Sequence, residues 1–306
     1  MRLASLFSRV SLHWGFVVRL PGATAAQPAL PIPPVTTVVG AFSAPLFRLL
    51  GVPFGNPSII KGGRAILSEH FECSLRSTLA AAAGLSGEGG LVMYQELTKI
   101  ATSPYKGGKD WWDKVKMKIG TPGFYNNFIP TAQAVQAVGA SYGPGTRLDL
   151  AWVLDVDELA DCLAKRGVKA SRADVEAALA LAAHGVSRLG SKEGIASVME
   201  GKYIDKIEII YKGSIKTRFY VPERCVEPLS EEVGKAQLWD TSYQPATYYA
   251  PGVLSKTLWV SSSPLEYRLL DDMGCAAYKL VSEKRIGESK KRIILGIVVG
   301  EKPREK

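Results

Sequence analysis

Apolar and polar residues alternate in the segment RVSLHWGFVVRL at positions 9–20. Apolar residues occupy every second position, and Arg9, His13 and Arg19 lie among the positions between them. Such alternation is typical of a β-strand with one apolar and one polar face. The sequence therefore predicts a half-buried strand whose second face is basic.

A proline-rich connector follows at positions 28–34, and the apolar spacing then becomes that of a helix. The helical positions are Val38, Val39, Phe42, Leu46, Leu49 and Leu50. Thr36 or Thr37 is expected to cap this helix, because a hydroxyl oxygen can accept a hydrogen bond from an amide of the first turn. Gly51 and Pro53 are expected to end it.

A second strand is predicted at 147–156, RLDLAWVLDV, where apolar residues again alternate. Asp155 or Asp157 then caps a short helix that ends near Arg166. An Ala-rich stretch at about 74–84 also predicts a helix.

Ser171, followed three residues later by Asp174, forms a capping-box-like pattern that begins another helix. Its buried stripe is expected to comprise Val175, Leu179, Ala182, Val186 and Leu189. From Tyr203 the pattern is β-rich. It predicts a hairpin at 203–221 and strands at 257–261, 276–281 and 292–299. The chain as a whole is predicted to be α+β.

Charge adds the expectation of an anionic partner. The 306 residues carry a formal net charge of +9, and the first 68 contain no Asp or Glu. The cations of that segment are Arg2, Arg9, Arg19, Arg48, Lys61 and Arg64. An acid-poor N-terminus is also typical of a targeting peptide, but Arg9, His13 and Arg19 would interrupt its apolar core. The asymmetry therefore favours binding to a polyanion.

Four cysteines lie far apart at 73, 162, 225 and 275, and none forms a CxxC pair. This spacing argues against a zinc ribbon and against a disulfide framework, and we expect a reducing cytoplasm. No run approaches the roughly 18 apolar residues of a spanning helix, so we expect a soluble protein.

Lysines are interleaved with tyrosines and tryptophans at 91–119, where Lys106, Lys109 and Trp111 lie close together. Lysine offsets phosphate charge and an aromatic ring can stack on any base, so the composition is typical of a surface that binds single-stranded nucleic acid. The alternative is an exposed Lys-rich hairpin whose tryptophans pack into the core.

A Gly-rich segment, SRLGSKEG at 187–194, includes Arg188, Gly190, Ser191 and Lys192. Free amides of such a loop can contact phosphate oxygens, although the P-loop spacing is absent. A helix C-cap at Gly190 would explain the same glycine without a ligand.

Two motifs resemble the CRISPR-associated Cas five family of the RAMP superfamily, in the type I-A Cascade form. The first is PIPPVTTVVGAF, Pro31 to Phe42, after the first strand, and the second is SRLGSKEGIASV, Ser187 to Val198. The resemblance implies a ferredoxin-like (RRM-type) domain at 1–200 and a smaller β-rich part at 201–306. It also implies that 91–120 corresponds to an inserted basic thumb.

The same resemblance implies a subunit that holds the 5′ handle of the crRNA and caps the backbone of Cas seven subunits. Its further partners would be the large subunit and the helicase and nuclease components, with no membrane contact. Gly40 is expected to let a backbone approach closely. The residues expected to bind RNA are Arg9, His13, Arg19, Pro34, Thr36, Thr37, Gly40, Lys106, Lys109, Trp111, Arg188, Gly190, Ser191 and Lys192.

Catalysis is the alternative function. Some members of the family cut precursor crRNA without a metal, using Tyr, Lys and His, and this chain has only His13, His70 and His184. Neither His13 nor His70 lies in a His/Lys/Tyr cluster of the sequence, and His184 is expected to be structural. We therefore expect a non-catalytic subunit without metal or cofactor, with a metal-independent endoribonuclease as the alternative.

Overall fold

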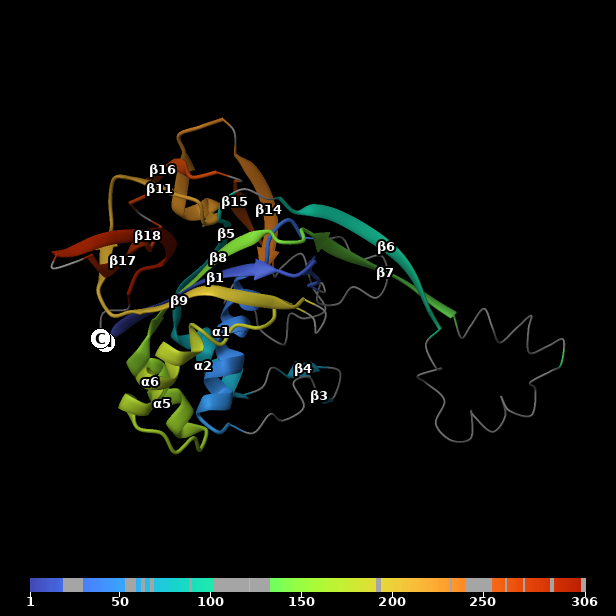
Figure 1. The fold of residues 1–306 in the computed structure, drawn as a ribbon, viewed down its shortest axis with the longest axis horizontal. Helices are drawn as coiled ribbons and strands as arrows, with labels where there is room; N and C mark the ends of the chain where they lie inside the picture. Colours follow the sequence, from blue (N-terminus) through green and yellow to red (C-terminus); the bar gives the residue numbers. More distant parts are fainter. Residues whose placement is uncertain are drawn as a thin grey trace.

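A computed structural model describes residues 1–18, 30–52, 59–61, 64–66, 69–87, 90–101, 121, 133–190, 194–231, 233–239, 255–261, 263–271, 273–286 and 289–303. Its core is an antiparallel four-stranded sheet in the order β5-β8-β1-β9 (Figure 1). The strands are β1 (Leu3–Leu12), β5 (Thr78–Leu85), β8 (Arg147–Asp155) and β9 (Ala196–Ile204). The prediction of an α+β chain is confirmed.

Helices cover one face of this sheet, and the C-terminal strands lie over the other (Figure 1). The helices are α1 (Val35–Leu49), α2 (Glu69–Ser77), α5 (Val156–Lys165) and α6 (Arg172–Ala182). Trp152 of β8 stacks on Phe42 of α1 with ring centroids 6.3 Å apart. The hydroxyl of Ser8 in β1 donates to the carbonyl of Ala183, directly after α6. None of the helices in the described part of the chain is long and apolar enough to span a bilayer.

The first strand differs from the prediction over 9–20, because β1 begins at Leu3 and ends at Leu12. Residues 4–8 are buried on both faces, so they do not alternate and the pattern misses them. After a bend, β2 (Gly15–Phe16) follows and belongs to a separate sheet. Where β1 does overlap the prediction, Val10 and Leu12 are buried as expected.

The N-cap of α1 is Pro34, so the prediction that Thr36 or Thr37 caps this helix is wrong. Pro34 has extended backbone angles and makes no side-chain cap, and its carbonyl accepts hydrogen bonds from the amides of Thr37 and Val38. The helix therefore starts one residue before Thr36, which places both threonines in its first turn. Of the expected apolar stripe, Val38, Val39, Phe42 and Leu46 are buried, whereas Leu50 is partly buried and Leu49 is exposed.

The caps of the other two predicted helices are confirmed. Asp155 accepts hydrogen bonds from the amides of Asp157 and Glu158 at the start of α5. Ser171 and Asp174 form a reciprocal capping box at the start of α6. The predicted stripe from Val175 to Leu189 is buried.

The prediction of a helix over 74–84 is wrong in its second half, because α2 ends at Ser77 and 78–85 form β5. A run of alanines favours a helix by local propensity. Here, however, small residues are required where the C-terminal strands cross the sheet. A Cβ on Gly84 would lie 2.5 Å from the carbonyl oxygen of Arg218, and one on Gly300 would lie 2.1 Å from that of Leu79.

The C-terminal part consists mostly of short strands, arranged in three-stranded sheets β10-β17-β18, β11-β16-β13 and β12-β15-β14. Their bounds are β10 (Ile207–Ile210), β11 (Ser214–Thr217), β12 (Val221–Pro222), β13 (Val226–Pro228), β14 (Gly234–Trp239), β15 (Ser255–Val260), β16 (Leu265–Leu269), β17 (Cys275–Ile286) and β18 (Ser289–Glu301), with the 3-10 turn η2 (Glu223–Cys225) between β12 and β13. The predicted boundary near residue 200 falls within β9.

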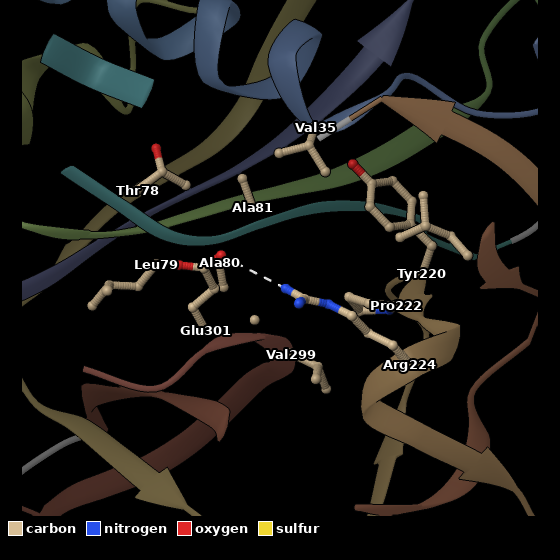
Figure 2. Close-up of a pocket in the computed structure, with 12 residues that line it drawn as sticks. Val35, Thr78, Leu79, Ala80, Ala81, Tyr220, Pro222, Arg224, Val299 and Glu301 are labelled. Carbon is tan, nitrogen blue, oxygen red and sulfur yellow. Dashed lines mark ion pairs between the residues drawn. The ribbon is translucent and has the colours of Figure 1, made fainter. Parts of the chain in front are cut away.

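A pocket of about 40 Å³ lies between β5 and the C-terminal strands (Figure 2). Arg224 and Glu301 form an ion pair across it, at 3.6 Å. The volume suits about one water molecule, so this pocket is a packing gap between two layers.

A long hairpin extends to the right in Figure 1, on the side of the molecule away from β17 and β18. It consists of β6 (Val92–Ala101) and β7 (Gln133–Tyr142), and β7 also pairs with β2. The predicted basic and aromatic segment begins in β6, and its part beyond Ala101 lies outside the described residues. A separate small hairpin joins β3 (Ile59–Lys61) and β4 (Arg64–Ile66).

The expectation that the cysteines form no disulfides is wrong. Cys73 of α2 is bonded to Cys162 of α5, and Cys225 of η2 to Cys275 of β17. The partners are 89 and 50 residues apart in sequence, and packing of α2 on α5 brings the first pair together. Spacing along a chain does not reveal pairs that tertiary packing creates, which is why the sequence missed them.

Candidate nucleic-acid interface

A hollow of about 470 Å³ separates one face of α1 from the loop that follows α6. From α1 it is lined by Thr36, Thr37, Gly40, Ala41, Ala44, Pro45 and Arg48, and from the loop by Ser187, Arg188 and Gly190. The two sequence motifs, about 150 positions apart, therefore meet at one place. Residues of both motifs are among those predicted to bind RNA.

The first turn of α1 supplies polar groups to this hollow. The amides of Val35 and Thr36 precede the first intrahelical hydrogen bond, so the helix itself offers them no acceptor. The amides of Thr37 and Val38 already donate to Pro34, at 2.9 and 3.1 Å. Together with the threonine hydroxyls, the start of the helix dipole makes this end attractive to an anion.

Gly40 is half-buried on the wall of the hollow, one turn beyond the threonines. A Cβ at this position would meet only the ring of Phe71, at an ordinary contact distance of 3.8 Å. Among the described residues, no close backbone approach therefore requires this glycine, although glycine weakens a helix by about 1 kcal/mol relative to alanine.

Two glycines fix the opposite wall. A Cβ on Gly185 would lie 2.6 Å from Cβ of Pro45, so the absence of a side chain lets the loop approach α1. Gly190 has φ +76° and forms a parallel β-bridge with Val17. Because α6 ends at Ala182, the alternative that Gly190 is the C-cap of this helix is wrong.

Further backbone contacts hold the loop on both sides of residues 191–193. Leu189 is fully buried, and its amide donates to Gly194 at 2.7 Å. Arg188 forms an antiparallel bridge with Ile195. The side chain of Arg188 is exposed from this anchored backbone. These backbone contacts therefore fix the position from which the Arg188 side chain extends.

Charge at the hollow is positive. Arg48 and Arg188 are both exposed, and none of the described residues that line the hollow is acidic. With the helix dipole of α1, these two guanidinium groups form an electrostatic environment suited to phosphate.

Arg9 and His13 do not line the hollow. Arg9 pairs with Asp149 through two hydrogen bonds, at 2.8 and 3.1 Å, and with Glu200 at 3.4 Å. Asp149 is fully buried and also pairs with Arg218 at 3.3 Å, and hydrogen bonding to Asp149 raises the pKa of Arg9. His13 Nε2 lies 2.7 Å from the hydroxyl of Ser197.

Six predicted residues cannot be placed relative to this hollow because they lie outside the described residues. They are Arg19, Lys106, Lys109, Trp111, Ser191 and Lys192. Pro34 acts as the N-cap of α1, so its contribution is to set where the helix begins.

Arg48 was missed as a site residue, although the sequence holds a signal for it. Thr37, Gly40, Ala44 and Arg48 follow one another at helical spacing on the face opposite the apolar stripe. Small residues that end in an arginine describe an open, basic helix face. What the sequence does not show is that the loop after α6 lies opposite this face.

Comparison with known proteins identifies a relative. The chain is 28% identical over 217 residues to the protein named CRISPR system aCascade subunit Cas5 1 from Saccharolobus solfataricus, with 70% of this chain and 71% of that protein covered. The resemblance to the Cas five family is confirmed. No family model matches the chain.

Solved structures add a likeness of fold. A crystal structure of a CRISPR protein from Archaeoglobus fulgidus superimposes with a TM-score of 0.51 at 16% identity, covering 97% of this chain and 99% of that one. A chain of a CRISPR RNA-guided surveillance complex gives a TM-score of 0.27 at 10% identity, with 74% and 72% covered, which is too low to support a conclusion about fold.

Proposed function

We propose that this chain is a crRNA-binding subunit of a CRISPR surveillance complex, and that the hollow between α1 and the loop after α6 holds phosphates of the crRNA 5′ handle. The observation that carries the proposal is the meeting of the two motifs around one basic hollow. The relative in Saccharolobus is named as an aCascade subunit, which supports the type I-A assignment.

The ferredoxin-like assignment is part of the same proposal. Counting only the strands of the central sheet in chain order, their spatial order is 2-3-1-4, all antiparallel, with α1 between the first two strands and α5 and α6 between the last two. A βαββαβ unit has this connectivity. The partners proposed with it are the Cas seven backbone and the large subunit, in the cytoplasm.

Handle binding is tested with the full chain and a labelled single-stranded RNA that carries the repeat-derived handle. The double variant Thr37→Val/Arg188→Ala should weaken binding at least tenfold, because it removes a hydroxyl and a charge-assisted phosphate contact. The log–log salt dependence should also become shallower by about 0.7 for the lost phosphate contact.

The matched control is Arg268→Ala, which removes an exposed arginine from β16. Its affinity should stay close to that of the unaltered chain. If the two variants bind the handle equally well, the hollow is not the handle site.

The alternative of a metal-independent endoribonuclease remains distinct from this proposal. His13 is held beside Ser197 of β9, whereas the ring of His70 in α2 makes an edge contact with Phe47 of α1, at 6.2 Å. These two histidines therefore belong to different parts of the fold. Cleavage of repeat RNA in EDTA that His13→Ala or His70→Ala abolishes would favour the enzyme instead.

A further inference from the structure

The loop after α6 pairs, as a short additional strand, with the start of β9. The amide of Leu189 donates to the carbonyl of Gly194 at 2.7 Å, and Arg188 forms an antiparallel bridge with Ile195. On its other side β9 pairs with β1, and β1 pairs in turn with β8. The loop that lines the hollow therefore belongs to the same extended sheet as β8.

A row of residues crosses one face of this extended sheet. Residues directly opposite one another in an antiparallel pair share a face, and successive residues of a strand alternate between faces. Arg188 therefore shares a face with Ile195, and with Ser197 two positions further along. In the register, Ser197 lies opposite Ser11 of β1, and Ser11 lies opposite Arg147 of β8. These five residues, here called the exposed row, are exposed apart from the half-buried Ser11.

Burial of the intervening residues supports this assignment of faces. The residues that alternate with the exposed row along the four strands are Leu189, Ala196, Leu12 and Leu148, and all of them are buried. His13 adds a polar group beside the row, because its Nε2 lies 2.7 Å from the hydroxyl of Ser197. The row is therefore a solvent-facing strip that begins at the hollow.

Two carboxylates lie in the next row of the same face, and cations hold both of them. Arg9 lies between Asp149 and Glu200 in the register, and it pairs with each. Lys202 also pairs with Glu200, at 3.0 Å. These carboxylates are engaged within their own part of the sheet.

The arginines at the two ends of the exposed row differ from Arg9. Arg147 and Arg188 are both exposed, and neither forms an ion pair with any of the residues that the structure describes. Hydroxyl groups of Ser11 and Ser197 lie between them. Guanidinium and hydroxyl groups together are suited to phosphate and sugar oxygens.

We propose that the exposed row binds the sugar-phosphate backbone of a single RNA strand that passes from the hollow, beside Arg188, to Arg147. The inference rests on the proposed function, because the strand in the hollow is its starting point. Strand spacing and register place the Cα atoms of the two arginines roughly 16 Å apart. Stacked nucleotides rise by about 3.4 Å each, so about five of them span this distance. Because the row offers contacts to the backbone, it should accept any base sequence.

The test measures anisotropy of the full chain with a labelled single-stranded RNA that contains the handle extended at both ends. Arg147→Gln should weaken binding on the order of tenfold and make the log–log salt dependence shallower by about 0.7, for one lost phosphate contact. Arg147→Lys should keep the original salt dependence, because it keeps the charge. Combining Arg147→Gln with Arg188→Ala should reduce the slope by about 1.4, because the two arginines contact different phosphates.

The matched control is Lys216→Gln, which removes an exposed cation of β11 that forms no ion pair with the described residues. Its affinity and salt dependence should stay close to those of the unaltered chain. Arg147→Gln should unfold at an unchanged temperature, since Arg147 is exposed and unpaired among these residues.

Unchanged affinity and salt dependence in Arg147→Gln would overturn the proposal, as expected if a neighbouring protein covers the exposed row instead. If Arg188→Ala alone weakens binding, the second contact is refuted while the hollow remains. If neither arginine matters, the hollow is refuted as well. A loss in Arg147→Gln without one in Arg188→Ala would also contradict a strand that continues from the hollow.

Discussion

Gly190 forms a parallel β-bridge with Val17, and a Cβ at Gly190 would lie 2.1 Å from the carbonyl oxygen of Val17. The loop after α6 is thereby held against the segment that follows β1. Arg188 lies two residues earlier, so this close approach determines where its guanidinium is presented to the hollow. Gly190, which the sequence predicts to bind RNA, therefore also positions the loop.

Gly190→Ala should destabilise the chain by more than the roughly 1–2 kcal/mol that a left-handed conformation costs an alanine, because the Val17 backbone must also move. Handle affinity should fall as Arg188 shifts. Denaturant unfolding and RNA anisotropy check both effects. Gly51→Ala is the control, since Gly51 has φ +66° and no atom within 4 Å of the added Cβ. Equal stability of the two variants would contradict the role of the Val17 contact.

Gly40→Ala should have the opposite effect on stability. Of the residues that the structure describes, the added methyl group meets only Phe71, so the helix should gain about 0.5–1 kcal/mol. If the hollow admits an RNA backbone closely, the same methyl group should weaken handle binding several-fold. A stabilised variant with unchanged affinity would remove Gly40 from the proposed site while leaving Arg188 in it.

Local patterns predicted the elements whose apolar residues alternate in the sequence or whose caps are local, such as β8 and the box formed by Ser171 and Asp174. These patterns failed where contacts with a distant segment determine the secondary structure or the burial of a residue. The alanines of β5 form a strand because the C-terminal strands cross over them, and the residues 4–8 of β1 are buried from both sides. In the same way, the sequence predicted each wall of the hollow separately but could not show that Arg48 lies across from Arg188.

Arg9 and Asp149 should be strongly coupled, because Asp149 is fully buried between Arg9 and Arg218. Removing one partner of a buried pair typically costs about 3–5 kcal/mol, and Asp149→Asn should approach that range. A double-mutant cycle with Arg9→Gln measures the coupling. The exposed pair of Arg268 and Glu227 provides the comparison and should give about 1 kcal/mol or less.

The same variants test the predicted RNA contact of Arg9. If Arg9→Gln loses stability without a loss of handle affinity beyond that of Arg268→Gln, the arginine serves the core. A selective loss of affinity in Arg9→Gln would instead retain it among the RNA-binding residues.

Because the chain contains two disulfides, we expect its stability to depend on redox state. Each closes a long loop, of 89 and 50 residues by sequence separation, and each should contribute about 3–4 kcal/mol. Reduction should therefore lower the unfolding temperature. Denatured chain should show no free thiol before reduction and four after it. Cys225→Ser/Cys275→Ser isolates the second bond, and four titratable thiols in the untreated chain would contradict both.

Buried tyrosines predict a loss of stability at alkaline pH. Burial raises the pKa of Tyr267 and of Tyr278, whose phenol also donates to the carbonyl of Glu301. Below about pH 10 these phenols are neutral in the folded and unfolded chain alike, and the stability is unaffected. Above it the unfolded chain ionises first, so stability falls as pH rises towards the folded pKa. Unfolding temperatures between about pH 8 and 11 should therefore fall less steeply in Tyr267→Phe than in the unaltered chain. Identical slopes in Tyr267→Phe and the unaltered chain would contradict the burial argument.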